Sequence, residues 1–135
     1  MHRVTFKIPR AGIIGLDAID DEHEEVVECL DFVRLHIEEG SASNLRKTRE
    51  ACQLLLAHFK SEERLMQSHS YPHLAHHVVH HDQTLGAIYR ILGNCEHIQA
   101  VGIEDLRELF RVLIDDIFSA DIAFSSYLAR TGVIR

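Results

Sequence analysis

The sequence predicts an all-α protein, an up-down-up-down four-helix bundle with an extended N-terminal arm. Four segments place apolar residues at intervals of three and four, the period with which an α-helix buries one face. Seven glycines and two prolines in 135 residues are too few for the many turns of an all-β chain. Long helices with short connections pack against their sequence neighbours in opposite directions, which gives a bundle.

Length and composition limit the kinds of protein that this chain can be. The 135 residues suit a single domain, 1–135, and contain no internal repeat. A formal charge of −7 argues against non-specific binding of nucleic acid, which relies on clustered Lys and Arg. The chain has no apolar run long enough for a membrane helix, and its first residues lack the apolar segment of a signal peptide. We therefore expect a soluble, cytoplasmic protein with no nucleic-acid or membrane partner.

The three cysteines, Cys29, Cys52 and Cys95, are far apart and odd in number. This pattern fits neither a disulfide framework nor a CxxC zinc motif. We expect reduced thiols that pack as small core residues.

The arm and the first helix differ in periodicity. Residues 1–16 mix β-branched residues with proline and glycine and show no helical period, so we expect an extended arm that lies on the bundle. A helix over about 18–39 follows, and Asp17 or Asp20 can cap its start. Its apolar face contains one imidazole, that of His23, among aliphatic side chains.

The second and third helices carry the most unusual pattern in the chain. They span about 45–68 and about 73–93, and Tyr71-Pro72 makes a corner between them, because proline cannot continue a helix. Two pairs of polar residues, each four residues apart, interrupt their apolar faces: His58 with Glu62, and His77 with His81. Residues four apart lie on the same face of a helix, so each pair points inward together.

The fourth helix spans about 103–129 and has a continuous apolar stripe of leucine, isoleucine, alanine and phenylalanine. Asp116 and Asp121 flank this stripe, one on either edge.

The inward polar residues together predict a metal site. Ionisable groups are costly to bury unless they are paired or bind a metal. Imidazoles suit iron, zinc or copper, carboxylates suit hard cations, and helix bundles commonly hold di-iron sites between facing helices. The candidate ligands on this basis are His23, His58, Glu62, His77 and His81.

Each residue taken alone has a less specific interpretation. A single buried histidine is more often a hydrogen-bonded core residue than a ligand, and the pair in the second helix can be an ordinary helix pair worth about 0.2–0.5 kcal/mol. His76 and His80 have the same spacing as His77 and His81, but the aliphatic residues that follow are in phase with the latter pair. The residues that we assign to a solvated face and corner are His69, His73, His76 and His80.

Four motifs occur in order along the chain: Ile19-Asp20-x-x-His23, His58-Phe59-x-x-Glu62-Glu63-x-x-Met66, Tyr71-Pro72 and His77-x-x-x-His81. In this order and spacing the chain resembles the hemerythrin family, particularly bacterial hemerythrins, from the arm to the fourth helix. The resemblance implies a four-helix bundle with a non-haem di-iron centre that binds O2 reversibly. The implied cofactor is two iron ions, Fe2+ or Fe3+, with a bridging oxo or hydroxo group.

The resemblance also implies a role for each ligand. His77 and His81 bind one iron, His23 and His58 bind the other, and Glu62 bridges them. The last motif of the family is a histidine followed five residues later by a bridging aspartate; here Asp116 occupies the histidine position and Asp121 the aspartate position. Asp115 is a less suitable candidate for the histidine position, because the five-residue step to Asp121 begins at Asp116. Asp116 either binds its iron as a carboxylate or leaves an open position there. Glu22 replaces the usual glutamine before the first histidine, and the arm lacks the usual tryptophan.

Three functions fit this reading. The first is a di-iron protein that binds or responds to O2, for storage, delivery or sensing. The second is a di-iron oxidase or peroxidase-type enzyme, because an anionic ligand such as Asp116 favours Fe(III). The third is a metal-binding or iron-handling protein without O2 chemistry. The expected partners are O2, another diatomic molecule or a peroxide, together with an electron donor, and we expect a monomer or weak oligomer.

Overall fold

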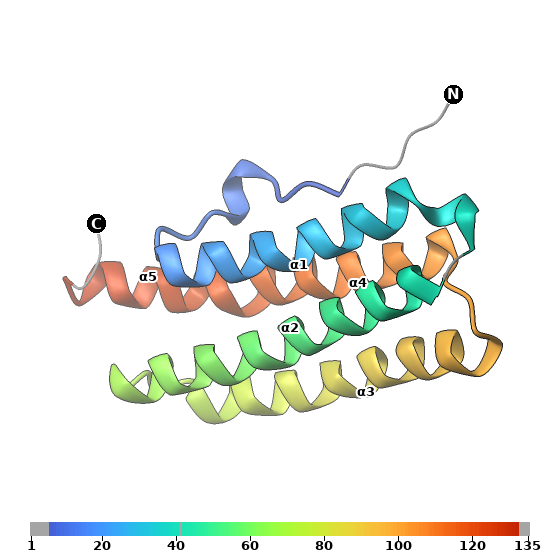
Figure 1. Cartoon of the computed structure of the whole chain (residues 1–135). Coiled ribbons are helices and arrows are strands. Elements are labelled where there is room, and N and C mark those ends of the chain that lie inside the picture. The colour runs from blue at the N-terminus through green and yellow to red at the C-terminus, as the bar shows by residue number, and fades with distance from the viewer. Residues whose placement is uncertain (1–5, 41, 133–135) are drawn as a thin grey trace.

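The computed structural model describes residues 6–40 and 42–132, which form a bundle of long helices (Figure 1). The main helices are α1 (Asp17–Leu35), α2 (Ala42–Ser68), α3 (Leu74–Ile98), α4 (Ile103–Asp116) and α5 (Ile122–Arg130). A π-helical segment, Ile117–Asp121, joins α4 to α5, so that these three pieces form one continuous rod. Short 3₁₀ turns occur at Arg10–Gly12 and Ile37–Glu39. The described residues contain no β-strand, and the predicted all-α bundle is confirmed.

The helices form a ring of neighbours, with a smaller contact between α2 and α4 across it. α1 contacts α2, α2 contacts α3, α3 contacts α4, and α4 returns to α1. Successive helices run in opposite directions, with short connections at the two ends of the bundle (Figure 1). In this arrangement, one face of each of the four helices points into a common interior.

The residue at the N-cap of α1 differs from the predicted one. Leu16 occupies the cap position and makes no side-chain bond there, so the prediction of a cap by Asp17 or Asp20 was wrong. The Asp20 carboxylate instead accepts hydrogen bonds from the backbone N–H groups of Ile14 and Gly15, at 3.0 and 3.1 Å. It therefore holds the end of the arm. Residues 1–5 of the predicted arm lie outside the described residues.

Two helices end at other places than expected. α1 stops at Leu35, and a 3₁₀ turn takes up the last part of the predicted helix over 18–39. α3 continues past Gly93 to Ile98, because a glycine inside a helix costs only about 1 kcal/mol relative to alanine and the continuation buries Cys95. Gln99, with a left-handed φ of 56°, ends this helix.

Apolar side chains fill the bundle as two clusters separated by polar residues. Along α2, Leu55 and Phe59 belong to the larger cluster and Met66 to the smaller one, with Glu62 between them. The smaller cluster also holds Tyr71, Phe124 and Leu128. The polar layer therefore lies inside the core and not at one end of it.

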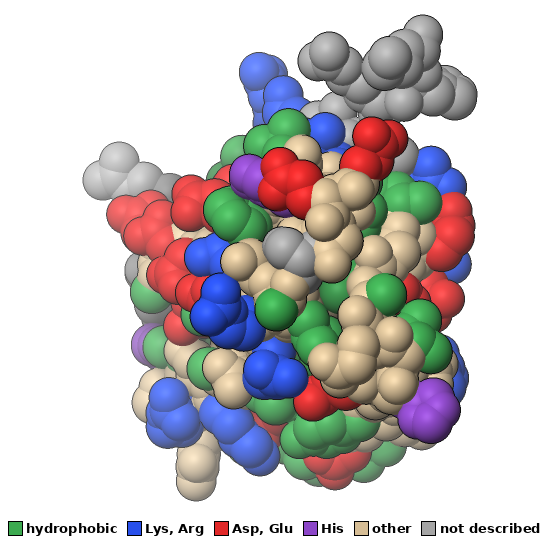
Figure 2. All heavy atoms as spheres, turned by 45° about the vertical axis from the view of Figure 1, so that its right-hand side comes forward, with side chains coloured by type: hydrophobic (Ala, Val, Ile, Leu, Met, Phe, Trp, Pro, Cys, Tyr) green, Lys and Arg blue, Asp and Glu red, His purple; other side chains and the backbone are tan. Residues whose placement is uncertain are grey.

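The three cysteines are free and buried, as expected. Acidic and basic side chains are interspersed on the face that Figure 2 shows, with hydrophobic atoms in small groups between them. Among residues 6–40 and 42–132, no helix has both the length and the apolar character needed to cross a membrane.

Candidate metal centre

Seven ionisable side chains meet inside the bundle, between the two apolar clusters. They are His23 of α1, His58 and Glu62 of α2, His77 and His81 of α3, Asp116 of α4, and Asp121 of the π segment. None of them is more than 4% exposed. These are the seven positions that the sequence singled out, and the structure brings all of them together.

The seven side chains form two groups that share one residue. In the first group, ligand-capable atoms of His23, His58, Glu62 and Asp121 all lie within 4.8 Å of one another. In the second group, the same holds for Glu62, His77, His81 and Asp116. Glu62 turns Oε2 toward the first group, 3.5 Å from His58 Nε2, and Oε1 toward the second, 2.6 Å from His77 Nε2. A carboxylate in this position can bridge two cations, as in other di-metal helix bundles.

The two aspartates complete the groups. Asp121 Oδ2 lies 2.9 Å from His23 Nε2, and its Oδ1 lies 3.9 Å from His77 Nε2. Asp116 Oδ1 lies 3.2 Å from His81 Nε2. Asp121 thus belongs to the first group and faces the second with its other oxygen. Asp116 belongs to the second group and faces the first with Oδ2, which lies 3.7 Å from His58 Nε2.

The π segment explains how both aspartates face inward. Five residues are roughly 1.4 turns of an α-helix, so Asp116 and Asp121 would diverge in a regular helix, as the sequence stripe indicated. The N–H of Ile122 bonds to the carbonyl of Ile117, five residues earlier, and this wider turn brings the two carboxylates onto one face. Both are fully buried. Single π turns inside α-helices are found frequently at functional sites.

Two glutamates accept hydrogen bonds from the Nδ1 atoms of two histidines, on the side of each ring that faces away from the centre. His58 Nδ1 donates to Glu22 Oε1 at 2.9 Å, and His81 Nδ1 donates to Glu63 Oε2 at 2.8 Å. A carboxylate on the outer nitrogen leaves Nε2 free of its proton and aims it at a cation. The Phe59 ring also stacks on His81, with centroids 4.2 Å apart. These contacts were not predicted, although Glu63 stands inside one of the sequence motifs.

Burial and mutual contact shift the acid–base behaviour of the centre. Burial opposes the charge on His58, but adjoining carboxylates raise its pKa well above the usual value. The same balance raises the pKa of His81 to about 10. Burial and the nearby Asp121 raise the pKa of Glu62, while burial and the neighbouring His81 lower that of His77 to about 4. Opposite shifts in one buried cluster are typical of functional sites.

Several buried polar atoms of the centre and of the adjoining His80 have no hydrogen-bond partner among the described residues. They are His23 Nδ1, Glu62 Oε2, His80 Nε2, His81 Nε2, both Asp116 oxygens and Asp121 Oδ1. Such an atom costs about 1–3 kcal/mol if it stays unpaired. The oxygen and nitrogen atoms that converge here are ligands that suit first-row metal ions such as iron. The residues therefore fit a pair of bound cations.

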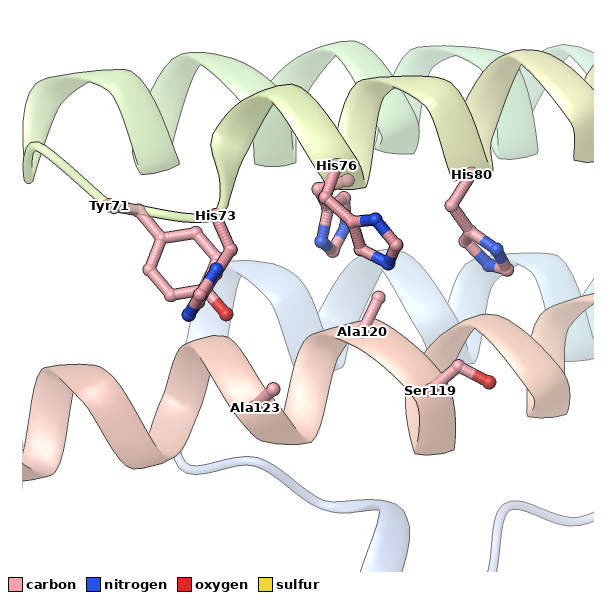
Figure 3. Close-up of a pocket in the computed structure, with 8 residues that line it drawn as sticks. Tyr71, His73, His76, His80, Ser119, Ala120 and Ala123 are labelled. Atoms are coloured by element: carbon pink, nitrogen blue, oxygen red, sulfur yellow. The ribbon is translucent and has the colours of Figure 1, made fainter.

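A pocket of about 260 Å³ opens beside the second group (Figure 3). Its wall consists of Tyr71, His73, His76, His77, His80, Ser119, Ala120 and Ala123. His73 and His76 are exposed, as predicted. The prediction of a solvated His80 holds only in part, because its side chain is 30% exposed but its Nε2 is buried, 3.5 Å from Asp116 Oδ1. The periodicity of α3 could not predict this contact of His80, because its partner Asp116 lies on another helix, α4.

Comparison with known protein families gives a match over most of the chain. The family model of the hemerythrin HHE cation binding domain matches residues 14–121. No curated protein and no solved structure matches the chain. The matched range includes every member of the two buried groups, from His23 to Asp121, and most of the bundle. The chain therefore belongs to the hemerythrin HHE cation-binding domain family.

Proposed function

We propose that this chain is a non-haem di-iron protein that binds or responds to O2, in storage, delivery or sensing. The observation that carries this proposal is the pair of ligand groups that share the buried carboxylate of Glu62. One iron site consists of His23, His58 and Asp121, the other of His77, His81 and Asp116, with Glu62 between them. A bound iron pair supplies a redox-active site for O2.

The chain supplies orientation, exclusion of water and a path from solvent. Glu22 and Glu63 fix the imidazoles of the two histidines that they contact. Phe59 and the fully buried Ile117 keep the centre apolar on one side. On the other side the pocket reaches the wall formed by His77, which gives a small molecule a way toward the second group.

Anaerobic loading with Fe(II), followed by addition and removal of O2, tests the proposal. We expect two irons per chain by metal analysis, and a visible absorbance band that forms with O2 and disappears when O2 is removed. Two irons that oxidise once, without a reversible band, would overturn O2 binding. Retention of zinc or manganese in preference to iron would instead indicate a metal-handling protein without O2 chemistry.

A second candidate, a di-iron oxidase or peroxidase-type enzyme, is favoured by Asp116. This residue is fully buried, and it places a third carboxylate beside four imidazoles. An anionic ligand in place of a neutral imidazole favours Fe(III) and lowers the reduction potential. Steady consumption of O2 or peroxide with an added reductant would support this candidate. In that case Asp116→His should raise the potential and slow turnover, and equal potentials in the two proteins would exclude it.

A further inference from the structure

We propose that His80 donates a hydrogen bond to Asp116 and so weakens this carboxylate as a donor to the metal that His77 and His81 hold. The inference rests on the proposed metal centre and concerns a histidine outside its ligand set. His80 Nε2 lies 3.5 Å from Asp116 Oδ1, and the same oxygen lies 3.2 Å from His81 Nε2. Both His80 Nε2 and Asp116 Oδ1 are buried, and neither has a hydrogen-bond partner among the described residues.

His80 is placed to act through Asp116 and not as a ligand itself. The ring centroids of His77 and His81 are 4.3 Å apart, and both residues belong to the second ligand group. The His80 centroid is 6.5 Å from that of His77 and 6.2 Å from that of His81, so His80 stands outside this pair. A carboxylate oxygen has two lone pairs. Asp116 Oδ1 can therefore bind the cation and accept the His80 N–H at the same time.

The contact fills a role that other residues of the centre already show. Glu22 and Glu63 accept hydrogen bonds from the Nδ1 atoms of His58 and His81. In the proposal, His80 is the corresponding hydrogen-bond partner of the Asp116 carboxylate. Metal-binding carboxylates are normally hydrogen-bonded, and loss of the outer partner weakens metal binding about 10- to 100-fold. His80 is thus a positioning residue of the second metal site.

The experiment compares wild type with His80→Ala, His80→Gln and His76→Ala. Affinity is measured with Co2+ by visible absorption, and reduction potential is measured on iron-loaded protein. We expect His80→Ala to lower Co2+ affinity about 10- to 100-fold, because Asp116 loses the contact that orients it. We expect the potential to fall as well, because the carboxylate without this contact is a stronger donor to Fe(III). His80→Gln keeps an N–H donor and should remain near wild type. His76→Ala, on the same pocket wall but exposed, is the matched control and should change neither quantity.

Two further measurements separate this role from a merely structural one. In an Asp116→His background, His80→Ala should have no effect on the potential, since the carboxylate that it serves is gone. Imidazole added to His80→Ala should restore the potential, because the pocket of about 260 Å³ reaches the vacated position. Imidazole should leave the His76→Ala variant unchanged.

The outcomes that would overturn the inference are distinct. Wild-type values in His80→Ala, or the same loss in His76→Ala, would show that the contact has no such role. An undiminished effect in the Asp116→His background would show that His80 does not act through Asp116. Wild-type protein that binds no metal would overturn the proposed centre as well, whereas metal-loaded wild type with an unresponsive His80 overturns this inference alone.

Discussion

Glu62 lies between the two groups of ligand-capable side chains, with Oε1 2.6 Å from His77 Nε2 and Oε2 3.5 Å from His58 Nε2. It is fully buried, and burial together with the nearby Asp121 raises its pKa well above that of an ordinary glutamate. A buried carboxylate of this kind needs a proton or a cation. At the scale of single residues, the centre therefore depends most on the one side chain that both groups share.

Replacing this carboxylate tests its role in both sites. Glu62→Gln keeps the shape of the side chain but removes its charge, so we expect bound metal to fall from two ions per chain to at most one. Metal analysis after loading and dialysis measures this. The matched control is Glu63→Gln, which removes only an outer partner and should keep two ions with about 10- to 100-fold weaker affinity. Two tightly held ions in Glu62→Gln would contradict the shared role.

The pH dependence of the metal-free protein tests the contacts of His81. Although burial opposes the charge, adjoining carboxylates raise its pKa to about 10 in the folded state, above the usual 6.5. A raised pKa in the folded state stabilises the fold fully below about pH 6.5, and this contribution disappears as the pH rises through about 10. The difference in free energy of unfolding between wild type and His81→Gln, from urea titrations, should therefore shrink over this range. A difference that stays constant with pH would refute the contact.

The sequence identified those residues whose position follows from the period of a single helix. His58, Glu62, His77 and His81 replace apolar residues in regular stripes, so their burial could be predicted. The contacts of Glu22, Glu63 and His80 could not, because they depend on how neighbouring helices are rotated against one another. A side chain at the edge of a stripe can face solvent or the next helix, and periodicity does not distinguish the two.

At the scale of elements, the π segment Ile117–Asp121 is the feature that shapes the centre. It adds one residue to the rod formed by α4 and α5, and this brings Asp116 and Asp121 onto the same face. The five-residue spacing in the sequence was the available signal. In a regular α-helix, residues five apart lie on different sides, so the helical period alone predicts the two aspartates on opposite edges of the stripe.

Deleting the exposed Ser119 tests this view of the π segment. The deletion should leave a regular α-helix in which the two aspartates are four residues apart and both still inward. We expect metal stoichiometry and thermal stability to be retained. The matched control is deletion of the exposed Lys60 from the regular helix α2, which rotates Glu62 by roughly 100° relative to His58 and should abolish metal binding. Equal damage from both deletions, by metal analysis and circular dichroism, would count against the view that the π turn only accommodates one extra residue between the two aspartates.

At the scale of the whole molecule, the metal centre replaces part of the hydrophobic core. Two apolar clusters lie on either side of seven buried ionisable side chains, all within one bundle. The bundle and its helix order could be predicted, since the apolar periods and the short connections are local features. The continuation of α3 past Gly93 could not, because the burial of Cys95 depends on packing between helices.

Bound metal should therefore stabilise the whole fold. Free metal at about 100 times its dissociation constant adds about 2.7 kcal/mol to the free energy of unfolding. For a chain of this size we expect removal of metal by a chelator to lower Tm by roughly 10 °C. Scanning calorimetry of loaded and metal-free protein measures this, and readdition of metal should restore Tm. An unchanged Tm would mean that the polar layer does not need a cation.

The most direct test of the two-site centre is an anaerobic Fe(II) titration of metal-free wild-type protein, with bound iron counted per chain after free metal is removed. The two groups that share Glu62 predict saturation at two irons. Saturation at one iron, or no retained iron, would contradict a centre in which one carboxylate serves two cations.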